Sequence, residues 1–267
     1  MQQPLKSELV TSGHNVYDQI MSITDPCDRF IPALDYDDWD SALDGLESFG
    51  DLIRFAKVNS LADIGGPDNA CSLLAAYNLK SMVDYKLHEI GETMRKRARN
   101  IALGGAAIIT LHASAGVEGM QDAVTGIDQA METGRLIERP MLCAVTVLTS
   151  HKESTCIQIY GSHRKSKVRQ LAHMAVDAGV EGLVCATSEA EMVKNDPYTE
   201  KLVVIVPAIR PCFVTISDEQ SANGATSKQA YEAGADMTTA GRPFLESRLY
   251  GLSDREAVKL IQSENAA

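Results

Sequence analysis

Short apolar runs alternate with longer stretches of helical period along almost all of this 267-residue chain. Several runs are continuously apolar, which is typical of parallel strands that are covered on both faces. The eight runs lie at residues 30–34, 52–58, 81–86, 106–111, 141–148, 182–185, 202–207 and 237–240. Helical periods lie between them, as at residues 39–49, 93–103, 116–133, 165–178, 188–195 and 227–233. The alternation predicts a (β/α)8 barrel, although an open doubly wound sheet shares it.

No linker rich in Pro, Gly or Ser and no shift in composition divides the chain. A barrel of this kind commonly takes roughly 250 residues as one domain. We therefore expect one (β/α)8 TIM-barrel domain at residues 29–267, preceded by an N-terminal helical extension at residues 1–28. In that extension, Leu5, Leu9, Val16 and Ile20 are candidate contacts of an amphipathic helix.

The charge balance limits the classes of partner. The formal net charge is -11 and no run of Lys and Arg forms a basic patch, which argues against long nucleic acid or an anionic membrane as a partner. A small phosphorylated substrate is compatible with this balance, because one local cluster of donors can hold a phosphate on an acidic protein. The N-terminal stretch has neither the apolar segment of a signal peptide nor a run of transmembrane length.

Six cysteines are scattered along the chain without CxxC or zinc-finger spacing. Three of them lie in or beside apolar runs, where a free thiol behaves as a small apolar group. No disulfide framework is visible, so we expect a protein of the reducing cytoplasm.

Charged side chains follow the predicted strands, at the end where barrels hold their active sites. Asp84 and Lys86 are two residues apart, so on a strand both would project towards the barrel axis. Lys57 closes the preceding strand, and Glu89 falls in the turn after Lys86. A surface ion pair at a strand end is one interpretation. Charges directed into a cleft are the other, and they are the better functional candidates.

Two arginines follow the last two predicted strands. Arg242 comes after Gly241, which lets a backbone N–H approach a ligand closely, and Arg210 ends the strand before. The loop after the eighth strand is a frequent phosphate site in such barrels. Each arginine alone suits a solvated surface equally well, but the pair favours an anionic ligand. No HExxH, GxGxxG or dense carboxylate cluster is present, so we predict neither a metal site nor a dinucleotide site.

An ordered set of motifs lies on the successive predicted strands: ALD (33–35), KV (57–58), DxKxxE (84–89), HAS (112–114), VTVLTS (145–150), GLVC (182–185), PAIRP (207–211) and GRP (241–243). Together they resemble orotidine 5'-monophosphate decarboxylases of the bacterial type. The resemblance runs from about residue 29 to about residue 247. One such motif alone is weak, but their order on successive strands makes the resemblance specific.

The resemblance implies a homodimer with shared active sites that converts orotidine 5'-monophosphate (OMP) to UMP, without a cofactor, in de novo pyrimidine biosynthesis. It implies a charged catalytic tetrad of Lys57, Asp84, Lys86 and Glu89. Lys86 would protonate C6 of the pyrimidine after CO2 has left, and Glu89 would act in the partner subunit's site.

The same resemblance implies the substrate contacts. Asp35 matches a ribose-binding residue, Thr149 a pyrimidine-binding position, and Thr93 a threonine that reaches across the dimer interface. The phosphate would be bound by Arg210, Gln220, Gly241 and Arg242.

The chain departs from the family pattern at several positions. Glu89 stands where the family carries Asp, and Gly91 stands where a proline is usual. Asn59 and Ala208 replace glycines.

Two other functions fit the same residues. Mg²⁺-dependent sugar-phosphate synthases and decarboxylases of the same superfamily share the Asp-x-Lys-x-x-Asp element, although the HASAG and VTVLTS stretches favour the nucleotide enzyme. A non-catalytic barrel that binds a nucleotide phosphate is the other alternative, since fold alone does not give function.

Overall fold

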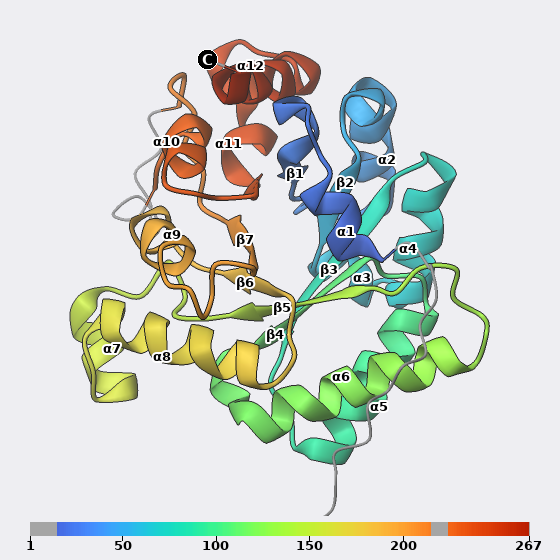
Figure 1. Cartoon of the computed structure of the whole chain (residues 1–267). Coiled ribbons are helices and arrows are strands. Elements are labelled where there is room, and N and C mark those ends of the chain that lie inside the picture. The colour runs from blue at the N-terminus through green and yellow to red at the C-terminus, as the bar shows by residue number, and fades with distance from the viewer. Residues whose placement is uncertain (1–14, 215–223, 267) are drawn as a thin grey trace, which may run out of the picture.

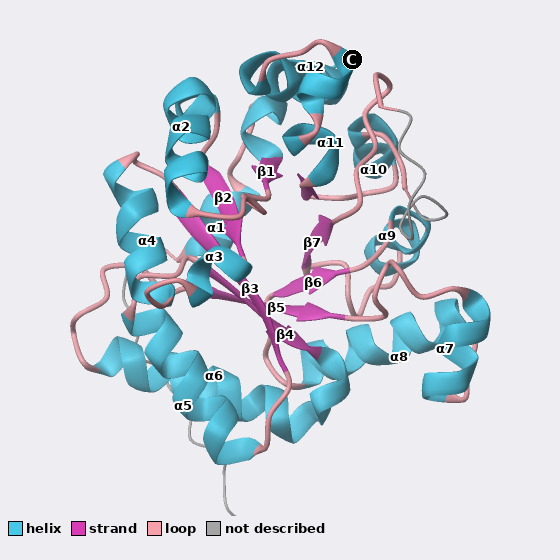
Figure 2. Ribbon diagram, turned by 180° about the vertical axis from the view of Figure 1, so that it is seen from behind, coloured by secondary structure: helices cyan, strands magenta, loops and turns pink. Residues whose placement is uncertain are grey.

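The computed structural model describes residues 15–214 and 224–266 of the chain. Its eight strands form one parallel sheet in the order β1-β8-β7-β6-β5-β4-β3-β2, and a bridge between Ala33 and Lys57 joins the first two strands. The predicted (β/α)8 barrel is therefore confirmed, and the open sheet is not. Figure 1 and Figure 2 show the helices arranged around this ring of strands.

The strands are short and lie close to the predicted runs. Their bounds are β1 (Phe30–Pro32), β2 (Phe55–Val58), β3 (Lys80–Leu87), β4 (Ile108–His112), β5 (Met141–Val145), β6 (Gly182–Val184), β7 (Val203–Val206) and β8 (Met237–Ala240). Alternate residues of a strand face opposite sides, so each strand serves two cores. In β7, for example, Val203 and Ile205 face the barrel interior, whereas Val204 and Val206 pack under the helices.

The main helices are α2 (Trp39–Phe49), α4 (Pro67–Ala76), α5 (Gly91–Leu103), α6 (Gly116–Glu132), α7 (Glu153–Tyr160), α8 (Arg164–Asp177), α9 (Thr187–Lys194), α10 (Ser227–Glu232) and α12 (Asp254–Ala266). The short helical segments are α3 (Ser60–Asp63), α11 (Arg242–Leu245), and the 3-10 helices η1 (Pro26–Arg29), η2 (Gly50–Leu52), η3 (Ala113–Ala115) and η5 (Ser247–Tyr250). Local chemistry sets several of their ends. At α2, the Asp38 side chain accepts a hydrogen bond from the Ser41 N–H at 2.8 Å and so caps the helix.

Helix α1 (Val16–Met21) covers the N-terminal end of the barrel, away from the strand ends that carry the predicted site. Val16 and Ile20 are buried in the interior core, as their apolar period indicates. The Tyr17 hydroxyl donates to the carbonyl of Lys201, just before β7. Leu5 and Leu9 lie outside the described residues. No helix in the described part of the chain is both long and apolar enough to cross a membrane.

Candidate active site

A cavity of about 440 Å³ opens at the C-terminal ends of the strands. This volume is within the usual range for small-molecule sites. Eight of the residues predicted from the sequence line it: Asp35, Lys57, Asp84, Lys86, Thr149, Arg210, Gly241 and Arg242. Residues from several different strands thus converge on one space, as barrel chemistry requires.

Three charged groups meet on one side of the cavity. The Asp84 Oδ2 atom lies 2.8 Å from Lys86 Nζ and 3.4 Å from Lys57 Nζ. The Lys57 ammonium also lies 3.3 Å from Asp35 Oδ1. Lys57 and Asp84 are only 9% and 7% exposed, so water screens their charges little. The result is a fixed array of alternating charges beside open space.

An irregularity in β3 brings Asp84 and Lys86 together. Val83 pairs with Ile109 and Leu87 with Leu111, so three residues of β3 lie opposite one residue of β4. Within this bulge Lys86 has a left-handed backbone with φ 48°. Bulges re-aim side chains in this way next to active sites. Regular strand alternation predicted that the two side chains share a face, but the bulge sets their positions.

The two arginines enter the cavity from beyond the ends of β7 and β8. Arg242 begins α11 directly after β8, and Arg210 is held by a hydrogen bond from its own N–H to the carbonyl of Ala225 at 2.8 Å. A Cβ atom on Gly241 would lie 2.6 Å from Asp35 Oδ2, so a larger residue here would force that carboxylate to move. Ala208 has φ 63°, which explains why glycine suits that position better.

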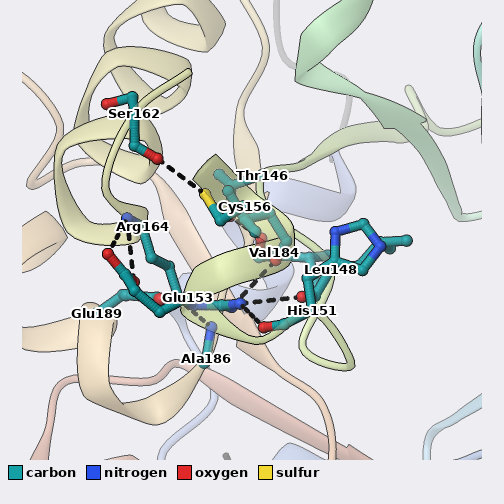
Figure 3. A network of polar contacts seen from close by, with 11 residues as sticks. Thr146, Leu148, His151, Glu153, Cys156, Ser162, Arg164, Val184, Ala186 and Glu189 are labelled. Carbon is teal, nitrogen blue, oxygen red and sulfur yellow. Dashed lines mark hydrogen bonds and ion pairs between the residues drawn. The ribbon is translucent and has the colours of Figure 1, made fainter. Parts of the chain in front are cut away.

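The loop after β5 carries Thr149 to the cavity. One buried arginine, Arg164, fixes this loop (Figure 3). The guanidinium of Arg164 donates to the main-chain carbonyls of Val147, Leu148 and His151, at 3.2, 3.0 and 2.8 Å. Its Nε also donates to the carboxylate of Glu189 on α9. Arg164 and Glu189 are 8% and 1% exposed, so this is a buried ion pair with its donors satisfied.

Two predicted residues lie outside the cavity of their own chain. Glu89 accepts a hydrogen bond from Arg97 Nη1 at 2.7 Å and is partly exposed beside Ile90, whose side chain is largely exposed. Thr93 is exposed on the first turn of α5. A third residue, Gln220, lies outside the described residues.

His112 ends β4 near the charged cluster. Its ring lies edge-on to that of His88, with 5.6 Å between the ring centroids. Burial lowers the pKa of His112 below its ordinary value, and the neighbouring His88 and Lys86 lower it further. The imidazole is therefore neutral at pH 7.

Sequence reasoning missed Thr110 and Arg164. Thr110 lies two residues before His112, so strand alternation places both side chains on the same face. This spacing could have marked Thr110 as a candidate. For Arg164 we find no signal in the sequence, because its partners lie far along the chain and most are main-chain carbonyls.

The model of the "Orotidine 5'-phosphate decarboxylase / HUMPS family" matches residues 28–250. An orotidine 5'-phosphate decarboxylase of Methylobacterium radiotolerans is 32% identical over 237 residues, covering 88% of this chain and 95% of the relative. That of Methylobacterium sp. is 33% identical over 242 residues, covering 90% and 97%. The crystal structure of orotidine 5'-phosphate decarboxylase from Lactobacillus acidophilus superposes with a TM-score of 0.72 at 26% identity, covering 90% of this chain and 100% of that one.

Proposed function

This chain belongs to the orotidine 5'-phosphate decarboxylase / HUMPS family, and on that premise we propose that it is a carboxy-lyase that converts OMP to UMP in pyrimidine biosynthesis. One observation of the site carries the proposal: the Asp84 carboxylate lies between two ammonium groups, Lys57 and Lys86, at the edge of the cavity. This array suits a reaction in which a carboxylate leaves and a carbanion is protonated.

The cavity offers a binding site for each part of the nucleotide. Arg210 and Arg242 supply the donors for the phosphate, with Gly241 allowing close approach and Gln220 as a further predicted donor. Asp35 accepts from the ribose hydroxyls, and Thr149 binds the pyrimidine. This arrangement sets C6 of the ring against Asp84 and Lys86.

The reaction itself needs one bond cleavage and one proton transfer. The bond from C6 to the carboxylate breaks, CO2 leaves, and the electron pair remains on C6. The Lys86 ammonium then gives its proton to C6, and water returns a proton to the lysine. Lys57 and Lys86 stabilise the negative charge while it is on the ring, because preorganised charges in a water-poor site need little reorganisation.

Binding energy from the phosphate supports this step at a distance. The phosphate takes no part in the bond cleavage, yet its contacts with Arg210 and Arg242 hold the pyrimidine against the charged cluster. Energy from such remote contacts can be used for orientation and desolvation at the reacting atoms.

We further propose that the active enzyme is a homodimer and that Glu89 of the partner subunit completes the charged array. Glu89, Ile90 and Thr93 form an exposed segment that contributes nothing to the cavity of its own chain. Ile90 is 79% exposed, which favours burial of this segment against a second copy. Thr93 would reach the partner's substrate from the same segment.

A cytoplasmic location is part of the same proposal. All six cysteines are free, and four of them, Cys71, Cys143, Cys156 and Cys185, are buried. Unpaired thiols suit a reducing compartment.

The decisive experiment follows the absorbance of OMP after mixing with the purified protein, with and without EDTA. We expect loss of OMP at the same rate in both. A protein that binds UMP but leaves OMP unchanged would instead be a non-catalytic binder. Activity that EDTA abolishes would favour the metal-dependent relatives.

A further inference from the structure

The bulge of β3 rests on one side chain of the neighbouring strand. Thr110 is the single residue of β4 that lies opposite Asp84, Tyr85 and Lys86. It is fully buried and does not line the cavity, so it does not touch a ligand there. Its hydroxyl nevertheless contacts both charged residues: Oγ1 accepts from the Lys86 N–H at 2.9 Å and lies 2.9 Å from Asp84 Oδ1.

Hydrogen-bond accounting fixes the direction of both contacts. A hydroxyl has one hydrogen, and a backbone N–H can only donate. Thr110 therefore accepts from Lys86 and donates its only hydrogen to Asp84. The second carboxylate oxygen of Asp84 is left to face the two lysines.

The same hydroxyl also stabilises an unusual backbone. Residues other than glycine are rarely left-handed, and such conformations persist only where the surroundings hold them. At Lys86 the bulge interrupts the hydrogen bonds between β3 and β4. The Thr110 hydroxyl accepts the hydrogen bond from the Lys86 N–H in place of a main-chain carbonyl of the neighbouring strand.

We propose that Thr110 is a positioning residue of the active site, which fixes the rotation of the Asp84 carboxylate and the left-handed backbone of Lys86 together. A shift of either residue would break its hydrogen bond to the Thr110 hydroxyl, which also holds the other residue. The inference rests on the proposed decarboxylase function, in which both groups must meet the reacting end of the substrate. A displacement of about 1 Å in such a group costs on the order of 10²-fold in rate.

The test compares wild type with Thr110→Val, Thr110→Ser and Thr238→Val. Valine keeps the volume of threonine and removes the hydroxyl, whereas serine keeps the hydroxyl. Thr238 is a matched control: it is fully buried on β8, and its hydroxyl pairs with Tyr231 rather than with the charged cluster. For each protein, kcat and KM for OMP, the Kd for UMP and the melting temperature are measured.

We expect Thr110→Val to lower kcat by about 10- to 100-fold, the range for a lost hydrogen bond to a charged group. The Kd for UMP should stay within about threefold, because UMP lacks the carboxylate that Asp84 faces and Thr110 does not reach the cavity. Thr110→Ser should restore most of kcat, and Thr238→Val should leave it unchanged.

A kcat for Thr110→Val within twofold of wild type would overturn the proposal, and so would an equal loss in Thr110→Ser. If Thr110→Val melts far below Thr238→Val, Thr110→Ala takes its place, because it removes the hydroxyl without adding bulk. An inactive wild type would instead refute the proposed function, so the two failures are distinguishable.

Discussion

Lys86 combines two features that no other lysine in the described part of the chain shares. Its ammonium lies 2.8 Å from Asp84 Oδ2, and its backbone is left-handed within the bulge of β3. Neither feature serves the core, because the side chain projects into the cavity. In the proposed reaction it is the only group placed to give C6 a proton.

Replacement of Lys86 by alanine should therefore abolish decarboxylation while UMP still binds, since the proposed phosphate contacts follow β7 and β8 and Lys86 lies on β3. Turnover of OMP and calorimetric titration with UMP measure the two effects. Lys96→Ala is the control, because Lys96 is a well exposed lysine on α5. Near-wild-type turnover in Lys86→Ala would remove Lys86 as the proton donor.

His112 makes the stability of the folded chain depend on pH. Its pKa is lowered by burial first, and then by His88, Lys86 and His151, while Asp84 acts in the opposite direction. The unfolded chain therefore takes up this proton more readily than the native one. Stability is fully present above the ordinary value of 6.5 and falls as the pH drops from there through the lower native pKa.

His112→Gln should accordingly lose less stability than wild type between pH 7.5 and about pH 5. Urea unfolding at a series of pH values measures the difference in the free energy of unfolding. Parallel curves for the two proteins across this range would show that His112 is not the group responsible.

At the scale of elements, the loop after β5 depends on the buried pair of Arg164 and Glu189. The pair links the first turn of α8 to α9 and holds three carbonyls of a loop that forms part of the cavity wall (Figure 3). Removing one member of such a pair leaves the other charge buried and alone. That is more costly than replacing the whole pair by apolar residues.

Arg164→Met should therefore lower the free energy of unfolding by about 3–5 kcal/mol. Arg54→Met is the matched control, because Arg54 pairs with Asp28 at the surface and its side chain is 64% exposed. For that variant we expect a loss of at most about 1 kcal/mol. Urea denaturation of both variants tests the contrast, and equal losses would contradict it.

The elements that the sequence predicted well are those with a clear apolar period. Residues 39–49 and 237–240 match α2 and β8 residue for residue, because burial on one or both faces leaves a plain pattern. Helix α12 was not predicted, although Ser253 and Glu256 form a capping pair at its start, with the Ser253 N–H donating to the Glu256 carboxylate at 2.8 Å.

The candidate site was predictable where polar residues follow apolar runs, as at Asp35, Asp84 and Arg242. The bulge at Lys86 was not, because it depends on how β3 pairs with β4 and no local pattern marks it. Thr110 was missed although its spacing from His112 places both residues on one strand face. Its importance comes from two partners that are distant in sequence, at 26 and 24 residues.

At the scale of the whole molecule, the proposed dimer makes each active site depend on two chains. Lys86 would serve the site of its own chain, and Glu89 would serve the site of the partner subunit. Two variants that are each inactive can then complement one another, since a mixed dimer has one site with both residues intact.

Lys86→Ala and Glu89→Gln should each have little activity alone. After the two are mixed under conditions that exchange subunits, about a quarter of wild-type activity per site should return, since half of the dimers are mixed and each has one intact site. Turnover of OMP before and after exchange measures the recovery. No recovery, with subunit exchange verified by mass, would contradict shared sites.

The strands that close the barrel are the first and the last to be synthesised. β1 is hydrogen-bonded to β8. Asp35, which follows β1, and Arg242, which follows β8, both line the cavity. While β8 is still inside the ribosome, β1 has no partner on that edge and the interior core is open to water. A translation product cut short before β8 would thus give a target for proteases and chaperones rather than a slow enzyme. Only chains that include β8 would then have activity.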